Sequence, residues 1–393
     1  MSDVPRLLDW CGPGGLVRPD ADLPNTVDLA RALATIGGAP GVTLTPNARR
    51  IGELIGEGAR HVVFVLADGL GMHLVETLPA DSFLRRHVAM ELQSVFPSGT
   101  PAALTSIATA SWPAEHAVTG WFLHLPHEGV TATILPYIDR FSKEPLAGVD
   151  SASALPVPSV MARFTRRTAA FMPRPICGSV YSRYFNGGAE EHPYDSLDAA
   201  VDQIAAHDAA VRAPAYTYLY VPHVDTAQHE HGVTSQQARS ALAATDAALA
   251  ALRERLPADA RIVVTADHGQ IDVDPDDALL IEDGSNVLET LRIPPTGDPR
   301  VLMCHVRDGR AADFERVFRR RYGEHFVLLT TDEAEELRLF GPVPLTAETR
   351  ARVGDYVAIA DAASVLLYQP EDRLRGVHGG LHRDEMRIPL VVA

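Results

Sequence analysis

Cysteine is scarce in this chain, and the long apolar runs of membrane proteins are missing. Its only cysteines, Cys11, Cys177 and Cys304, lie far apart without the spacing of a metal site. We expect them to be reduced and buried, which favours the cytoplasm. No segment approaches the ~18–20 apolar residues of a membrane span. The N-terminal stretch MSDVPRLLDWCGPGG also lacks the basic and apolar regions of a secretory signal. We therefore expect a cytoplasmic protein without a membrane partner.

Positive charge is also in short supply. The chain has 35 basic and 51 acidic residues, which gives a formal net charge of −16 at pH 7. Such a charge argues against a broad surface for polymeric nucleic acid, because the polyanion would be repelled. A small phosphate ester remains a possible partner if a cation sits in the site. The 16 histidines are candidate ligands for such a cation. The sequence leaves the oligomeric state open.

A chain of 393 residues can bury a large core. Its composition, with 46% apolar and 22% charged residues, is typical of a globular protein. We predict a single catalytic domain over 1–393 with a cap or insert at about 270–370. Within the insert, 300–306, 311–323 and 326–331 have a strand–helix–strand pattern. Residues 1–46, rich in proline and glycine, are expected to wrap the surface.

Strands and helices alternate along the rest of the chain. Continuous apolar runs predict buried strands at 61–68, 215–223 and 261–267, and helical patterns occupy 47–58, 195–213 and 234–256. This alternation predicts an α/β fold, a mostly parallel sheet with helices on both faces. A further strand at 91–100 leads into a helix that starts with Pro101, which makes Thr100 the expected N-cap. The basic stretch 163–175 is expected to be an exposed loop.

Polar side chains of one chemical kind gather at the predicted strand ends, where active sites of such sheets form. They are Asp68, Thr100, Asp225, His229, Asp267, His268 and, before the last strand, His378. Carboxylates and imidazoles in this mixture suit Zn²⁺, with Mn²⁺ as the alternative. Seven ligands are too many for one ion, so we expect two divalent metal ions. A pair of ions ~4 Å apart can hold both sides of a phosphoryl displacement.

Each of these signals also has a simpler structural interpretation. An Asp-Gly pair after a strand is commonly a turn, and Thr100 alone is most simply a helix cap. The spacing between Asp225 and His229 also occurs at solvent-exposed helix starts. His231, in the same segment, can equally be a residue that binds no metal. The combination carries more weight, because all of these residues are predicted at the ends of strands in one sheet.

Five segments in order resemble the type I phosphodiesterase / nucleotide pyrophosphatase family of the alkaline phosphatase superfamily. They read VFVLADGLG, FPSGTPAALTSIATASWPAEHAVTG, YLYVPHVDTAQHEHG, VVTADHGQ and GVHGG, and they run from about residue 61 to the C-terminus. The resemblance implies an alkaline-phosphatase-like fold and hydrolysis of a small phosphate ester. It also implies that Thr100 is the nucleophile and forms a phosphothreonine, whereas Ser98 is a rival hydroxyl. One metal would lie on Asp225, His229 and His378, and the other on Asp68, Asp267 and His268 beside Thr100.

The chain departs from the family pattern at two positions. Nucleotide-hydrolysing members carry an asparagine about twenty residues after the nucleophile, which holds a phosphoryl oxygen, and here Trp121 stands at the aligned position. Trp121 is as well explained by packing as by substrate contact. Pro101 also removes the backbone N–H next to the nucleophile. Two expected donors are therefore missing, and losing one such donor can cost about a hundredfold in rate.

Several functions compete. A phosphodiesterase or pyrophosphatase leads, and a phosphonate hydrolase or phosphomonoesterase of the same superfamily could use identical ligands. A sulfatase is disfavoured because Leu104 stands where its motif has arginine. A cofactor-independent phosphoglycerate mutase is disfavoured because its serine lies in a different motif. The non-enzymatic alternative is a degenerate metal-binding scaffold protein, against which the complete set of seven ligands counts.

Overall fold

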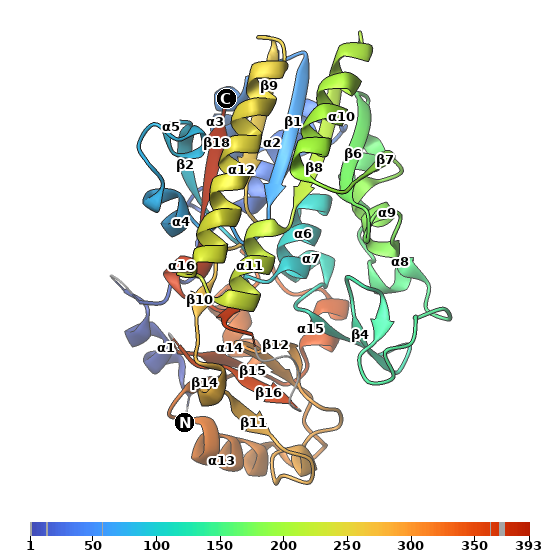
Figure 1. Ribbon diagram of the computed structural model, residues 1–393. Coiled ribbons are helices and arrows are strands. Elements are labelled where there is room, and N and C mark those ends of the chain that lie inside the picture. Colours follow the sequence, from blue (N-terminus) through green and yellow to red (C-terminus); the bar gives the residue numbers. More distant parts are fainter. Residues whose placement is uncertain (1, 13–14, 57, 362, 369–373) are drawn as a thin grey trace.

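A seven-stranded, mostly parallel sheet forms the larger part of the computed structural model (Figure 1), which describes residues 2–12, 15–56, 58–361, 363–368 and 374–393. Its order is β2-β18-β9-β1-β8-β6-β7. The strands are β1 (His61–Ala67), β2 (Val88–Gln93), β6 (Arg167–Pro173), β7 (Glu190–Tyr194), β8 (Ala215–Val221), β9 (Ala260–Thr265) and β18 (Arg387–Val392). The predicted α/β class and mostly parallel sheet are confirmed.

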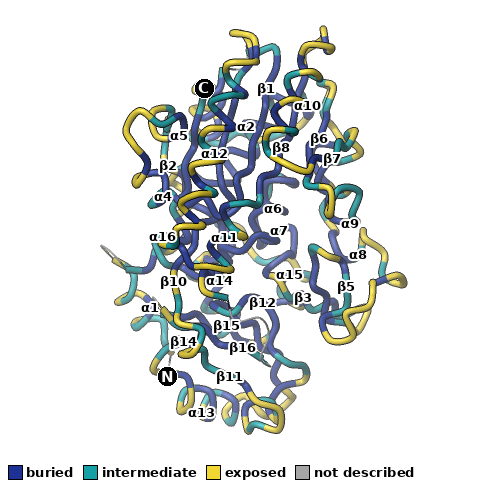
Figure 2. Tube along the Cα trace, viewed as in Figure 1, coloured by how far each residue is buried: buried dark blue, intermediate teal, exposed yellow. Residues whose placement is uncertain are grey.

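The centre of this sheet is apolar because helices cover both of its faces. Every residue of β1 and β8 is buried, as the continuous apolar runs predict. Figure 1 shows α10 (Leu197–Ala210) and α12 (Gln236–Arg255) in front of the strands, with α2 (Thr26–Gly37) and α3 (Pro46–Ile55) behind them. Figure 2 shows the strands buried and the outer faces of the helices exposed.

Two expectations for the periphery are wrong. The segment 1–46 does more than wrap the surface, because ten of the twelve residues of α2 are buried beneath the sheet. The basic stretch 163–175 contains a strand of the main sheet instead of a loop, since β6 buries Ala169 to Met172 between β7 and β8. Its arginines flank the buried part, and Arg167 at the strand's start is exposed.

The last strand runs against its neighbours. β18 pairs antiparallel with both β9 and β2, whereas β1 pairs parallel with β8 and β9. The start of an antiparallel strand lies at the edge where its parallel neighbours end. The segment that precedes β18, which includes β17 (Gly376–Val377), therefore approaches the carboxyl ends of β1, β8 and β9.

A second seven-stranded sheet lies beyond these carboxyl ends (Figure 1) and is antiparallel. Its strands, in spatial order, are β14 (Phe326–Thr330), β15 (Tyr356–Ala360), β13 (Val301–Cys304), β12 (Thr296–Asp298), β3 (Phe122–Leu125), β4 (Val130–Thr133) and β5 (Ile138–Asp139). The predicted strand–helix–strand pattern corresponds to β13, α13 (Ala311–Tyr322) and β14. The sequence pattern missed β3 to β5, each of four residues or fewer.

The remaining elements are short. The helices are α1 (Val4–Trp10), α4 (Met72–Thr77), α5 (Phe83–Arg86), α6 (Thr100–Thr109), α7 (Pro113–His116), α8 (Ser151–Ala154), α9 (Val180–Asn186), α11 (His223–His231), α14 (Thr331–Glu336), α15 (Ala347–Val353) and α16 (Arg383–Met386). The small strands are β10 (Ile271–Asp272), which pairs with β17, and β11 (Leu279–Ile281), which pairs with β16 (Leu366–Tyr368). Among the described residues, no helix has both the length and the apolar character needed to cross a bilayer.

A buried ion pair ties the two sheets together. Arg300, just before β13, donates from Nε to Glu385 Oε1 at 2.7 Å, and neither side chain is exposed. The Glu385 carboxylate also accepts the backbone N–H groups of Gly380 at 3.0 Å and His382 at 2.9 Å. The pair thus anchors the loop that follows His378 to the second sheet.

We predict that Glu385→Ala lowers the free energy of unfolding by about 3–5 kcal/mol, because it leaves the Arg300 guanidinium buried without its counter-charge. Urea denaturation of the purified protein measures this change. Asp195→Ala is the control, since it removes the acid of the exposed Arg174–Asp195 pair and should cost less than about 1 kcal/mol. Equal losses in the two variants would contradict the anchoring role of Glu385.

Candidate functional site

The predicted site residues come from separate elements that end at one edge of the main sheet. Asp68 follows β1, and Asp267 and His268 follow β9, so that the turn after each strand carries the side chains. The remaining four positions are Asp225 and His229 on α11, His378 directly after β17, and Thr100 at the start of α6. The structure brings all seven together, and six of them form two clusters of potential ligand atoms.

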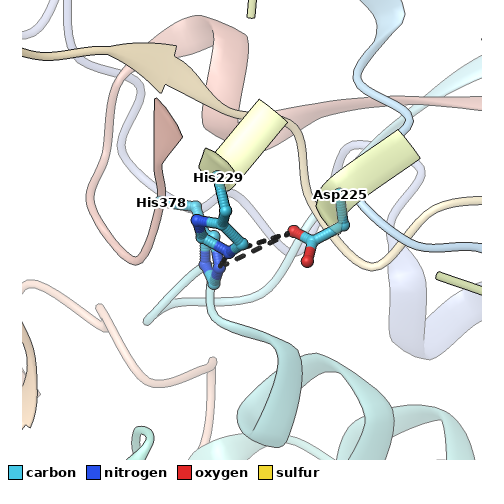
Figure 3. A group of neighbouring side chains, drawn as sticks. All are labelled: Asp225, His229 and His378. Atoms are coloured by element: carbon cyan, nitrogen blue, oxygen red, sulfur yellow. Dashed lines mark hydrogen bonds and ion pairs between the residues drawn. The ribbon is translucent and has the colours of Figure 1, made fainter. Parts of the chain in front are cut away.

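The first cluster consists of Asp225, His229 and His378 (Figure 3). Asp225 and His229 are four residues apart on α11 and share one face of the helix. His229 Nε2 lies 3.3 Å from Asp225 Oδ1, and His378 Nε2 lies 4.0 Å from the same oxygen. The two Nε2 atoms are 3.3 Å apart.

Backbone carbonyls fix the orientation of both imidazoles in this cluster. His229 Nδ1 lies 2.7 Å from the Gly376 carbonyl, and His378 Nδ1 lies 3.3 Å from the Ser98 carbonyl. A ring that donates its Nδ1 proton to a carbonyl presents Nε2 as an acceptor. Two facing acceptors cannot bond to each other, but both can bind a cation. This arrangement is typical of metal-ligating histidines.

The second cluster consists of the buried Asp68, Asp267 and His268. His268 Nε2 lies 3.2 Å from Asp267 Oδ2 and 3.6 Å from Asp68 Oδ1. One oxygen of each carboxylate is already bonded, since Asp267 Oδ1 accepts two backbone N–H groups and Asp68 Oδ2 accepts from Tyr220. The other oxygens, Asp68 Oδ1 and Asp267 Oδ2, are buried without a hydrogen-bond partner. Buried, unpartnered carboxylate oxygens fit a bound cation.

Burial and close charged neighbours shift the pKa values of acids and imidazoles in the two clusters. Burial, and then the charges of Asp225 and Asp267, raise the pKa of the Asp68 carboxyl well above its ordinary value. Burial, and then the neighbouring His268 and His229, lower the pKa of His378 well below its ordinary value. A divalent cation in each cluster would stabilise the ionised acids and the neutral imidazoles. The donor chemistry of both clusters fits such ions.

Thr100 lies beside the second cluster, with its hydroxyl 3.0 Å from His268 Nε2. The expectation that Thr100 caps its helix is wrong: Gly99 is the N-cap, Thr100 is the first helical residue, and no side chain caps this end. The hydroxyl is thereby free to face the cluster. The rival Ser98 is fully buried and donates to the Gly380 carbonyl at 2.7 Å.

A cavity of about 750 Å³ opens over both clusters and the Thr100 hydroxyl. Most of its wall is apolar or aromatic, and Trp121 stands 36% exposed among the lining residues. No lysine or arginine occurs among the described residues that line it. His231 is outside the cavity and pairs with Glu230 at 3.5 Å, as a bystander would.

Sequence reasoning missed three polar residues at the site. Tyr220 donates to Asp68, and Gln270 donates to Asp225, so each holds a carboxylate in place. Gln270 is two residues after His268 and Tyr220 is five residues before Asp225, and this proximity to predicted ligands is the signal that could have identified them. Asp298 lines the cavity from the second sheet, and it gave no such signal because it lies far along the chain from every predicted ligand.

The model of the type I phosphodiesterase / nucleotide pyrophosphatase family matches residues 62–381. The chain belongs to this family. The match covers both clusters and Thr100, and the predicted family and hydrolytic enzyme class are thus confirmed. Members of the family depend on metal ions, and the two clusters are the candidate ligands in this chain. A search of curated protein sequences gave no match.

Solved structures share the fold of this family member at low sequence identity. Murine ectonucleotide pyrophosphatase / phosphodiesterase 5 is 18% identical with a TM-score of 0.64, over 84% of this chain and 87% of that one. The human protein of the same name is 16% identical with a TM-score of 0.63 and the same coverage. Phosphonoacetate hydrolase from Sinorhizobium meliloti 1021, in complex with phosphonoacetate, is 20% identical with a TM-score of 0.60, over 84% of this chain and 89% of that one.

Proposed function

We propose that this family member is a metal-dependent phosphodiester hydrolase that acts through a phosphothreonine on Thr100. The observation that carries the proposal is the position of the Thr100 hydroxyl, 3.0 Å from His268 Nε2 at the floor of a cavity that both ligand clusters border. A threonine hydroxyl is a weak nucleophile unless its pKa is lowered. A cation held beside it by Asp68, Asp267 and His268 meets that need.

In this proposal, Asp225, His229 and His378 hold one divalent ion, and Asp68, Asp267 and His268 hold the other, with Thr100 as an additional ligand. Zinc is the expected metal because carboxylates and imidazoles make up six of the seven ligands, and manganese is the alternative. When bound, the two ions would supply the positive charge that activates the nucleophile and offsets the charge of the phosphoryl oxygens.

The chain's own residues then account for the displacement. Thr100 Oγ1 forms a bond to phosphorus as the bond to one ester oxygen breaks, and the hydroxyl proton ends on the departing alcohol. Water next attacks the phosphothreonine and releases a phosphate monoester together with the free Thr100 hydroxyl. The helix that begins at Thr100 directs its positive dipole end toward the phosphoryl group.

The second ester group is expected to lie against the apolar wall of the cavity, where Trp121, Phe122 and Ile176 line it. This wall offers contact area but no positive charge. A phosphonate with a carboxylate would find no lysine or arginine among the described lining residues, which makes phosphonate hydrolysis the second candidate. The murine relative has been solved as an inactive variant with AMP, and a nucleoside is one possible ester group here.

Two metal ions per chain are expected in fully loaded wild-type protein, measured by elemental analysis after zinc saturation. Asp225→Ala and His378→Ala should each lower the count by about one, because each removes a primary ligand of the same ion. His231→Ala is the matched control, since His231 lies on the same helix outside the cluster, and it should keep both ions. A single ion in active, saturated wild-type protein contradicts the two-metal proposal, and no bound ion favours a scaffold protein.

Thr100→Ala should reduce phosphodiester turnover to background while the protein keeps its fold and most of its metal, because only the attacking oxygen and one ligand are lost. Steady-state kinetics and elemental analysis on one preparation measure both properties. Ser98→Ala is the control: it loses one buried hydrogen bond, worth about 1 kcal/mol of stability, and should stay active. An active Thr100 variant beside an inactive Ser98 variant would reverse the assignment.

Bis-(4-nitrophenyl) phosphate should be cleaved with at least about tenfold higher kcat/KM than 4-nitrophenyl phosphate, which corresponds to about 1.4 kcal/mol of transition-state binding. The apolar wall favours the additional aryl ester, and the scarcity of positive side chains disfavours a dianionic monoester. A panel that includes phosphonoacetate, run on zinc-loaded and manganese-loaded enzyme, measures the preference. Equal or reversed rates would favour a monoesterase, and cleavage of the phosphonate alone would favour a phosphonate hydrolase.

A further inference from the structure

Asp298 is a carboxyl group of the cavity that belongs to neither ligand cluster. It ends β12 in the second sheet, is only 5% exposed and lines the same cavity as Thr100. Its Oδ1 accepts the backbone N–H of Trp121 at 3.1 Å, while its Oδ2 is buried without a hydrogen-bond partner. A buried acid with one unpartnered oxygen beside the nucleophile requires an explanation.

The carboxyl of Asp298 lies against the backbone that leads into the nucleophile. A Cβ atom placed on Gly99, the residue before Thr100, would come within 3.0 Å of Asp298 Oδ2. A Cβ on Gly120, before Trp121, would come within 2.9 Å of the same oxygen. A side chain at either position would crowd the carboxyl, so Oδ2 lies directly against the backbone of both segments.

This location coincides with the departure from the family pattern. Trp121 stands where nucleotide-hydrolysing members have an asparagine, and Pro101 offers no N–H. Asp298 is bonded to the backbone of that same Trp121. A protonated carboxyl has nearly the shape of a carboxamide and, with its single O–H, can also donate a hydrogen bond. The second sheet thus supplies the Asp298 carboxyl, a group of the right size, at the place where the first sheet lacks a hydrogen-bond donor for a phosphoryl oxygen.

The burial of Asp298 favours the neutral acid. Burial raises the pKa of its carboxyl to about 7, although the Trp121 N–H and the His268 charge act in the opposite direction. The other charged neighbour is Glu385, whose charge Arg300 balances at 2.7 Å. An anionic phosphoryl group in the cavity favours the protonated form of Asp298, whereas the two proposed cations favour the ionised form. The Asp298→Asn variant distinguishes the two forms, because its amide can only be the neutral donor.

We propose that Asp298 binds the phosphoryl group of the substrate by donating a hydrogen bond from Oδ2 to a non-bridging oxygen, in the role of the missing asparagine. The inference rests on the proposed phosphoester hydrolysis at Thr100. Because charge on that oxygen grows in the transition state, the bond contributes mainly to kcat.

The test compares Asp298→Asn, which keeps a donor at all pH values, with Asp298→Ala, which removes it. On bis-(4-nitrophenyl) phosphate, the Ala variant should lose about a hundredfold in kcat with little change in KM. The Asn variant should stay within about threefold of wild type. Asp259→Asn, at the opposite end of β9 and exposed, is the control for carboxylate removal. Thermal unfolding and metal content of each variant monitor fold and loading.

Binding of inorganic phosphate to the zinc-loaded protein, measured by calorimetry, gives a readout independent of turnover. The Ala variant should bind phosphate at least several-fold more weakly than wild type, and the Asn variant should bind it equally well. If wild type cleaves no phosphoester yet this binding pattern holds, the proposed function fails and the role of Asp298 stands.

Three outcomes overturn the role of Asp298. An Asn variant as impaired as the Ala variant indicates that an ionised carboxylate is needed. An Ala variant with wild-type kcat and phosphate affinity indicates no contact with the phosphoryl group. Wild-type protein that cleaves the diester but binds no phosphate overturns the role of Asp298 and leaves the proposed function standing. If the Ala variant does not fold, the Asn variant alone tests the role of Asp298. It should stay active if Asp298 acts as a neutral donor, and it should be impaired if Asp298 acts as an ionised acceptor.

Discussion

Uncompensated negative charge is the constraint on which the site depends. Asp68, Asp225 and Asp267 converge at one edge of the sheet, and no lysine or arginine lines the adjoining part of the cavity among the described residues. Bringing such acids together in a low-dielectric interior costs several kcal/mol for each unpaired charge. Protonation removes part of this charge, since the pKa of Asp68 is raised. Cations held by the free oxygens and the facing imidazole nitrogens are the proposed source of the remaining positive charge.

The fold keeps the acids in place through its topology. Parallel strands deliver Asp68 and Asp267 to the same edge, and the antiparallel β18 lets the preceding loop bring His378 to that edge from the other direction. The Arg300–Glu385 pair then fixes this loop against the second sheet. Because a ligand displaced by about an ångström loses its geometry, the rigidity of these attachments matters as much as the ligands themselves.

The parts that sequence reasoning predicted are those that local pattern specifies. Long apolar runs located β1, β8 and β9, and the polar residues at their ends located the clusters, because a parallel sheet gathers its carboxyl ends. The failures occurred where tertiary packing overrides pattern. The strand β6 lies in an arginine-rich stretch, for which the sequence predicted a loop. The strands β3 to β5 are too short to show a detectable hydrophobic periodicity. Thr100 matched a cap by composition, but its hydroxyl faces His268 instead.

Asp298 illustrates a limit of a different kind. The main sheet supplies the ligands, and its geometry can be inferred from the order of strands and helices along the chain. The second sheet supplies one wall of the cavity, and it is assembled from strands nearly 180 residues apart, since β12 pairs with β3. Contacts between Asp298 and the backbone around Gly99 and Trp121 exist only after both sheets have formed. The candidate metal ligands of this family member are therefore evident in its motifs, whereas the groups proposed to contact the phosphoryl oxygens depend on how the second sheet packs over the first.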